Sequence, residues 1–507
     1  RLLSLKPDLL DQRRQKGLDR DGYRTTLALD LKPEQVLRFR EQALGLRGAQ
    51  VDVDILRSYP NGTLAAHALG YTQPITESEF EILAEKGYKI RDRIGRTGVE
   101  AAYERHLRGK WGGQMLEVNA MGEVQRNLGD RPSQAGKDLV LTLDLDLQRE
   151  AVAALGDQRG AVVALDPLTG GVLAMVSNPS YDANLFVEGI SHSDYAKLRG
   201  SLDTPLLNRA VQGQYPPGST IKPLISLGAL AQDFITPEIE IPDPGWYRLP
   251  GDDRRYRDWT LRVRGTGHAE TVDLRMAIAE SCDTYYYDLA HRMGIDAMAE
   301  VLKPFGLGQR TGIDTTGEQD GILPSTDWKR TALGEPWYPG ETISAGIGQG
   351  YMLATPLQLA QAAMLLANKG ESFVPSIVHR VDDLTVGGVQ RPPMPMDEAD
   401  WQAVVAGMVD VVHSARGTAA GIARGIGYQV AGKTGTSQVV SIAQDAIYDE
   451  DAISERNRNH GLFVAFAPVE NPRIVIAVIA ENGGGSGAAS PVARRVMDAW
   501  LSKASDV

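Results

Sequence analysis

The chain has 507 residues, 42% of them hydrophobic and 23% charged, which is the composition of a globular protein with more than one core. A formal net charge of -12 argues against a nucleic-acid-binding protein, because phosphate contacts need a basic surface. The single cysteine, Cys282, excludes a disulfide within the chain. The longest apolar run, 474–480, is far shorter than the roughly 18 to 20 residues that cross a membrane.

The N-terminal region is polar and rich in charge, and none of its patterns indicates catalysis. Its clearest element is the helix-like stretch GVEAAYERHLRG at 98–109. Residues 137–156 alternate apolar and polar side chains and then change to helical spacing, which marks the start of a new unit. We therefore predict two domains, 1–136 and 137–507.

The second domain has strand patterns at both of its ends. Residues 160–177 form two apolar runs around a turn sequence, which predicts a hairpin. Near the C-terminus, 427–440 and 461–484 have the pattern of three strands, and 491–503 that of a closing helix. The long middle is helical. This order predicts an α+β fold, with helices packed against a largely antiparallel sheet.

The stretch YPPGSTIKPL at 215–224 places Ser219 and Lys222 at the start of a predicted helix, directly after Pro-Pro-Gly. At a spacing of three residues their side chains share one helix face. A serine hydroxyl becomes a nucleophile when a neighbouring base takes its proton, and an uncharged lysine can be that base. The alternative is that Ser219 caps the helix and Lys222 is solvated.

Two further segments carry chemistry. In ESCDTYYYDLA, Ser281 and Asp283 offer a hydroxyl and a carboxylate from a loop that leads into a helix, and the alternative is a helix cap. In AGKTGTSQ at 431–438, Lys433 interrupts the pattern of an apolar strand, and Gly435 allows the backbone of a ligand to approach closely.

Ser-x-x-Lys, a Ser-x-Asp variant of Ser-Asp-Asn and Lys-Thr-Gly, in this order, are the motifs of β-lactamases and penicillin-binding proteins. The chain resembles the elongation-type class B penicillin-binding proteins, the D,D-transpeptidases of the rod-elongation machinery. Longer stretches carry the resemblance too, including NRAVQGQYPPGSTIKP, IGQGYMLATPLQLA and GRTGVEAAYERHLRG. Asp283 departs from the asparagine of most relatives. The resemblance implies a serine β-lactamase-like transpeptidase domain on an elongated N-terminal pedestal of the dimerisation type.

The same resemblance implies a role for each motif residue. Ser219 would attack the D-Ala-D-Ala carbonyl of a peptidoglycan stem peptide, Lys222 would take its proton, and Ser281 would relay the proton to the leaving amine. Lys433 would bind the substrate carboxylate. The remaining site residues are Asp283 beside the catalytic groups and the substrate-binding residues Thr434, Gly435 and Thr436. β-Lactam antibiotics would acylate the same serine.

A metal site is a separate expectation. Asp243, Asp258 and His268 lie within 40 residues of Cys282, and together these four are a plausible tetrahedral zinc set. The alternative is that Cys282 is a small buried hydrophobic residue. Elongation-type relatives are described with an equivalent set, so the resemblance implies a structural zinc ion. No organic cofactor is expected.

Two other classes of function remain open from sequence. One is a β-lactamase or D,D-carboxypeptidase, which passes the same acyl-enzyme to water; no residue stands out as the base that deacylation by water needs. The other is a catalytically silent penicillin sensor or scaffold. The resemblance further implies a glycan polymerase of the SEDS class and a rod-shape scaffold protein as partners. It also implies a bacterial inner-membrane protein with one anchor N-terminal to this sequence and its catalytic domain in the periplasm.

Overall fold

The computed structural model describes residues 27–28, 31–42, 51, 56–89, 92–119, 124–440 and 453–503. The chain divides into two compact units, 1–57 and 58–507. In the described part of the first unit, helix α2 (Pro33–Gln42) carries the buried residue Phe39. The segment 441–452, which follows the Lys-Thr-Gly segment, lies outside the described residues.

The second unit begins with short elements. Strand β1 pairs antiparallel with β2, and β3 pairs antiparallel with β4 in an exposed hairpin. The elements of this part are α3 (Ala66–Leu69), β1 (Thr72–Pro74), α4 (Glu77–Leu83), β2 (Arg93–Gly95), α5 (Gly98–Ala102), α6 (Glu104–Leu107), β3 (Gly113–Val118) and β4 (Val124–Arg131). The helix predicted at 98–109 is therefore two short helices, which are separated at Tyr103.

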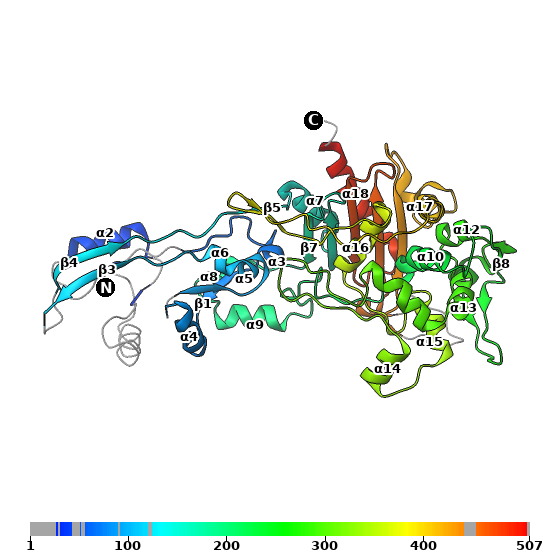
Figure 1. The fold of residues 1–507 in the computed structure, drawn as a ribbon, viewed down its shortest axis with the longest axis horizontal. Helices are drawn as coiled ribbons and strands as arrows, with labels where there is room; N and C mark the ends of the chain where they lie inside the picture. The colour runs from blue at the N-terminus through cyan, green and yellow to red at the C-terminus, as the bar shows by residue number, and fades with distance from the viewer. Residues whose placement is uncertain are drawn as a thin grey trace. The chain divides into compact units, whose positions relative to one another are not determined.

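A five-stranded sheet in the order β14-β15-β16-β6-β7 forms the centre of the second unit, and all its neighbouring strands are antiparallel. Its strands are β6 (Gly160–Leu165), β7 (Val172–Asn178), β14 (Ala431–Ser437), β15 (His460–Ala467) and β16 (Ile474–Ala480). In Figure 1 the orange and red C-terminal strands lie beside the teal strand β7. The predicted sheet, with strands from both ends of the domain, is confirmed.

Helices cover this sheet. Every residue of β16 is buried, so both faces of the sheet are shielded from water. Helices α7 (Leu145–Leu155) and α18 (Ser490–Lys503) pack against each other and against the sheet, while α16 (Pro356–Ala367) packs on β6, β15 and β16. The predicted closing helix is α18, and the predicted α+β architecture is confirmed.

The helices in the middle of the chain pack beside β14, the edge strand of the sheet. Helix α10 packs against α13, and α17 packs against α12 and β14. The further elements are β5 (Leu139–Leu141), α8 (Asn184–Val187), α9 (His192–Gly200), α10 (Lys222–Ala231), β8 (Ile241–Pro242), β9 (Trp246–Tyr247), β10 (Tyr256–Arg257), α11 (Trp259–Arg264), β11 (Thr271–Val272), α12 (Leu274–Ala279), α13 (Asp283–Leu302), α14 (Thr326–Leu333), α15 (Pro339–Ala345), β12 (Val378–Val381), β13 (Leu384–Thr385) and α17 (Glu398–His413). Across the described ranges, we find no helix with the length and apolar character needed to cross a membrane.

Candidate active site

Ser219 lies in a short 3₁₀ turn, Gly218–Ile221, that leads directly into α10. Helix α10 tolerates Pro223 because a proline in the first helical turn removes only an N–H group without an intrahelical partner. Ser219 is partly exposed, whereas the side chain of Lys222 is completely buried. Among the described residues, the Ser219 hydroxyl has no hydrogen-bond partner. The Ser219 hydroxyl is therefore accessible, and it has no hydrogen bond to a described residue that would have to break before it reacts.

Lys222 holds the first and second motifs together. Its Nζ donates hydrogen bonds to the backbone oxygen of Ser281 (2.9 Å), to Ser281 Oγ (3.3 Å) and to Asp283 Oδ1 (2.7 Å). Within the described part of the chain, Lys222 Nζ has no hydrogen bond to the Ser219 hydroxyl, although the backbone N–H of Lys222 donates to the backbone oxygen of Ser219. The alternative of a solvated lysine is excluded by the complete burial of this side chain. Lys222 is instead the centre of a buried polar network.

The second motif has an unusual backbone. Ser281 has a φ of 58°, which places a non-glycine residue in the left-handed region and costs conformational energy. Asp283 is the first residue of α13, and its N–H group donates to Asp258 Oδ2 at 2.6 Å. The helix cap is therefore supplied by Asp258 from another loop. Ser281 and Asp283 are free to turn their side chains toward Lys222.

The third motif lies on β14, at the edge of the sheet, and packs against the 3₁₀ turn that carries Ser219. A side chain at Gly435 would collide with Thr220, so glycine is needed for this close approach. The predicted approach of a ligand backbone at Gly435 stays a prediction. The Lys433 side chain is completely buried, and its Nζ donates to the backbone oxygen of Thr434 at 3.1 Å. Thr436 is exposed beside the turn.

We call Lys222, Ser281, Asp283 and Lys433 the lysine cluster; hydrogen bonds join the first three, and Lys433 is close enough to interact electrostatically with Lys222 and Asp283. Burial lowers the pKa of Lys433 well below its usual range, and the charge of Lys222 lowers it further. Burial raises the pKa of Asp283, while the Lys222 ammonium opposes that rise. Two buried amines that repel each other, with one carboxylate nearby, cannot both be charged at low cost. The cluster is therefore able to accept a proton close to a free hydroxyl.

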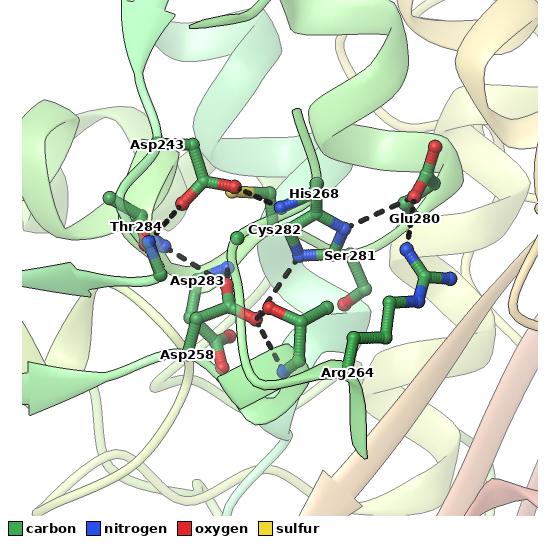
Figure 2. Close-up of polar contacts among 12 residues, drawn as sticks. Asp243, Asp258, Arg264, His268, Glu280, Ser281, Cys282, Asp283 and Thr284 are labelled. Carbon is green, nitrogen blue, oxygen red and sulfur yellow. Dashed lines mark hydrogen bonds and ion pairs between the residues drawn. The ribbon is translucent and has the colours of Figure 1, made fainter. Parts of the chain in front are cut away.

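A second buried group, the carboxylate cluster, borders the first and consists of Asp243, Asp258, His268, Glu280 and Cys282 (Figure 2). Ligand atoms of Asp243, His268 and Cys282 all lie within 4.8 Å of one another. Cys282 Sγ is 3.7 Å from Asp243 Oδ2. Asp258 adjoins this trio through His268, since its Oδ1 is 3.1 Å from His268 Nε2. The structure thus groups three of the four residues that the sequence suggested as a metal set, and the fourth, Asp258, contacts one of them.

Burial and the carboxylates of Asp243 and Asp258 dominate the electrostatics around Cys282. Burial raises the pKa of the Cys282 thiol well above its usual range, and the nearby carboxylates of Asp258 and Asp243 raise it further. Burial lowers the pKa of His268, but hydrogen bonds to Asp258 and Glu280 outweigh it and leave a net rise. Despite its burial, the bond to His268 lowers the pKa of Asp258 to about 2. A cation at this site would relieve the repulsion.

Several residues that complete these clusters were not predicted from the sequence. Glu280 lies 3.2 Å from His268 Nδ1 and pairs with Arg416, which also donates to the backbone oxygen of His268. Thr418 forms a 2.7 Å hydrogen bond with Thr434. Glu280 directly precedes the second motif, so its position was a usable signal. Arg416 and Thr418 lie in no recognisable motif, and only the fold brings them to the site.

This arrangement defines a serine acyl-transfer site. Its parts are a partly exposed serine, a buried lysine one turn away, a second serine bonded to that lysine and a second lysine on an edge strand. The sequence profile of the penicillin binding protein transpeptidase domain matches residues 160–498, and that of the penicillin-binding protein dimerisation domain matches residues 2–141. The chain therefore belongs to the penicillin-binding protein family. The predicted boundary between residues 136 and 137 stays a prediction.

Individual relatives agree with this family. The peptidoglycan D,D-transpeptidase MrdA of Acinetobacter baumannii is 44% identical over 95% of this chain and 71% of its own length. The crystal structure of Pseudomonas aeruginosa PBP2 in complex with WCK 5153 is 44% identical, with a TM-score of 0.78 over 89% of this chain and 92% of that chain. In the complex of PBP2 and MreC from Helicobacter pylori, the matching chain is 28% identical, with a TM-score of 0.83 over 98% of this chain and 92% of its own. A chain from a structure of a peptidoglycan synthase complex that coordinates polymerization and crosslinking is 30% identical, with a TM-score of 0.76 over 98% of this chain and 86% of that chain.

Proposed function

We propose that this chain is a serine D,D-transpeptidase that cross-links peptidoglycan stem peptides during cell elongation and rod-shape maintenance. One observation carries the proposal. Three segments far apart in the sequence meet around Ser219, because Lys222 bonds to both polar residues of the second motif and β14 packs on the turn of the first. A silent scaffold does not need two buried lysines, whose desolvation lowers its stability.

The acylation step assigns a role to each group. Ser219 Oγ bonds to the carbonyl carbon of the penultimate D-Ala, and the bond from that carbon to the nitrogen of the terminal D-Ala breaks. Lys222 takes the hydroxyl proton, and Ser281, which is 3.3 Å from Lys222 Nζ, passes it to the departing amine. An uncharged Lys222 is needed at this step, and Asp283, whose pKa burial raises, is placed to hold its proton.

Substrate binding falls to the third motif and the backbone. The N–H groups of Ser219 and Thr436 would bind the oxyanion of the tetrahedral intermediate, and the loss of one such donor costs on the order of a hundredfold or more in rate. The terminal carboxylate of the stem peptide would lie near Lys433, Thr434 and Thr436. That negative charge would draw a proton onto Lys433, whose pKa is low in the free protein.

The second half-reaction distinguishes a transpeptidase from a hydrolase. An amine of a neighbouring stem peptide attacks the acyl carbon, its nitrogen takes the place of Ser219 Oγ, and the proton it loses returns to the serine through Lys222. After acylation by a β-lactam, no acceptor amine reaches the acyl carbon, so this acyl-enzyme would persist. The alternative of a β-lactamase or D,D-carboxypeptidase would instead show rapid turnover of penicillin.

The test is intact-mass spectrometry after incubation with a labelled penicillin, followed by peptide mapping. We expect one stable adduct, on Ser219, and none in Ser219→Ala. Ser193→Ala, which removes an exposed hydroxyl on α9, is the matched control and should be labelled like the parent. Rapid release of hydrolysed penicillin would support the hydrolase. An unlabelled Ser219 would overturn the enzyme assignment.

We also propose that Asp243, Asp258, His268 and Cys282 hold a structural zinc ion. Ligands of tetrahedral zinc lie about 3.3 to 3.6 Å from one another. The distances of 3.1 Å between Asp258 and His268 and 3.7 Å between Asp243 and Cys282 are close to this spacing. Zinc would neutralise the carboxylates, stabilise the Cys282 thiolate and fasten the loop 243–268 to the start of α13. Metal analysis of the purified protein tests this.

We further propose partners and a location from the family. The similar chain from Helicobacter pylori is in complex with MreC, and another similar chain belongs to a peptidoglycan synthase complex. A rod-shape scaffold protein and a SEDS-class glycan polymerase are therefore the expected partners of this chain. The expected location is the periplasmic side of the inner membrane, with an anchor N-terminal to this sequence. Co-purification of each partner with the full-length protein tests these contacts.

A further inference from the structure

The loop after α15 contacts both sides of the gap in which the proposed oxyanion would form. Gly348 accepts a hydrogen bond from Gly218 N at 2.9 Å, directly before Ser219. The next residue, Gln349, donates from Nε2 to the backbone oxygen of Thr436 at 2.8 Å. Its Oε1 accepts from Gln438 N at 3.4 Å. The dipeptide Gly348-Gln349 therefore bonds to the first motif through its backbone and to the third motif through the Gln349 side chain.

The contact between Gln349 and Thr436 fixes the direction of a catalytic N–H group. In an antiparallel strand, the N–H and C=O groups of one residue point to the same edge. The carbonyl of Thr436 meets Gln349, and a side chain added to Gly218 would lie 3.2 Å from Thr436 N, so the N–H group also faces the free edge of β14. A side chain added to Gly218 would lie 2.6 Å from that carbonyl oxygen. The turn bearing Ser219 and the Thr436 amide thus meet at this edge.

The loop itself is firmly held. Gly348 has a φ of 71°, and an added side chain there would lie 2.2 Å from the backbone oxygen of Gly218, so only glycine fits. Gly348 N donates to Ala345 O (2.9 Å) and Gln349 N donates to Ser344 O (3.0 Å), both at the end of α15. Helix α15 packs against α13, whose first turn carries Asp283. Gln349 therefore projects from a rigid support.

We propose that Gln349 is a positioning residue for acylation. Its side-chain amide bridges Thr436 and Gln438 along the free edge of β14, and this bridge sets the separation between the N–H groups of Ser219 and Thr436. The inference rests on the proposed function, because it concerns the oxyanion of the acylation step. Misplacement of a reacting group by about 1 Å can cost on the order of a hundredfold in rate.

The experiment measures the non-covalent dissociation constant and the acylation rate constant of a fluorescent penicillin, together with the melting temperature. Gln349→Ala removes the bridge, and we expect acylation to slow by about 10- to 100-fold while penicillin binds within about threefold of its parent affinity. Gln349→Glu has the same shape, but it loses the donor and places a carboxylate oxygen against the Thr436 carbonyl. The loss with Gln349→Glu should be at least as large.

The control is Gln402→Ala, which removes an exposed amide on α17 and should leave all three quantities unchanged. Acylation within twofold of the parent in both Gln349 variants, at a temperature where they are folded, would overturn the proposal. A lower melting temperature with an unchanged acylation rate would also overturn it. A parent protein that takes no label on Ser219 would instead overturn the proposed function, so the two failures are distinguishable.

Discussion

The lysine cluster and the carboxylate cluster are adjacent and largely buried, but amines predominate in one and carboxylates in the other. In the first, Lys222 pairs with Asp283, and burial, together with the charge of Lys222, lowers the pKa of Lys433. In the second, three carboxylates surround one imidazole and one thiol, and the pKa of Cys282 rises. An excess of amines beside a free hydroxyl favours proton transfer. An excess of carboxylates favours a bound cation. The lysine cluster therefore suits proton transfer, and the carboxylate cluster suits the proposed cation.

The largest expected effect comes from removing the amine of the lysine cluster. Lys222→Met keeps the length of the side chain but cannot accept a proton, so we expect acylation by penicillin to fall by about 10³- to 10⁴-fold. Lys197→Met, an exposed lysine on α9, should behave like the parent. Labelling kinetics measure both. If Lys222→Met were acylated at nearly the parent rate, the lysine cluster would lose its distinction as the reactive site.

The equivalent change in the carboxylate cluster should affect stability rather than chemistry. Cys282→Ser weakens the proposed metal site, and loss of an ion present at about a thousand times its dissociation constant lowers the free energy of unfolding by about 4 kcal/mol. Metal content and urea denaturation with and without a chelator measure this. Asp253→Asn, a change at an exposed carboxylate in the same loop, is the control. Zinc-free parent protein, with no response to chelator, would contradict the prediction.

His67 is a buried titratable residue outside both clusters, and its burial disfavours the protonated form. Burial, aided by the charge of Arg209, lowers the pKa of His67 from 6.5 to about 4. Below pH 6.5 the unfolded chain binds a proton that folded His67 refuses, so stability is lost as the pH falls. By pH 4 this loss is about 3 kcal/mol, at about 1.4 kcal/mol for each pH unit.

His67→Gln should remove that part of the acid dependence. The measurement is the free energy of unfolding in urea between pH 7.5 and 4, and the two proteins should differ in slope between pH 6.5 and 4. Parallel curves would show that His67 is protonated without penalty.

The smallest expected effect sharpens the role of Glu280 in the carboxylate cluster. Its contact at His268 Nδ1 would keep Nε2 available to a metal ion. Glu280→Gln retains an acceptor but loses the charge, and we expect zinc affinity to fall by about 10- to 100-fold. Competition with a chromophoric chelator measures the affinity. Unchanged affinity would limit Glu280 to its ion pair with Arg416.

The sequence predicts the architecture and the identity of the motif residues, but not their connections. Apolar runs and turn residues place the strands of the sheet, and the motifs place Ser219 at a helix start. The sequence does not show that Lys222 bonds to Asp283 rather than to Ser219, or that Gly435 is needed for contact with the chain itself. These facts depend on how distant segments pack. Gln349 lies within one of the longer stretches that carry the resemblance, but a single amide has no periodic signal that would single it out.

Asp258 connects the two clusters through its two oxygens. Its Oδ1 faces His268, while its Oδ2 accepts from the N–H group of Asp283. The same carboxylate therefore contacts His268 and caps the helix that begins at Asp283, so a substitution at this position changes both contacts. Under antibiotic selection, mutations that reshape the drug-binding surface should accumulate elsewhere, and position 258 should stay fixed even in highly resistant lineages.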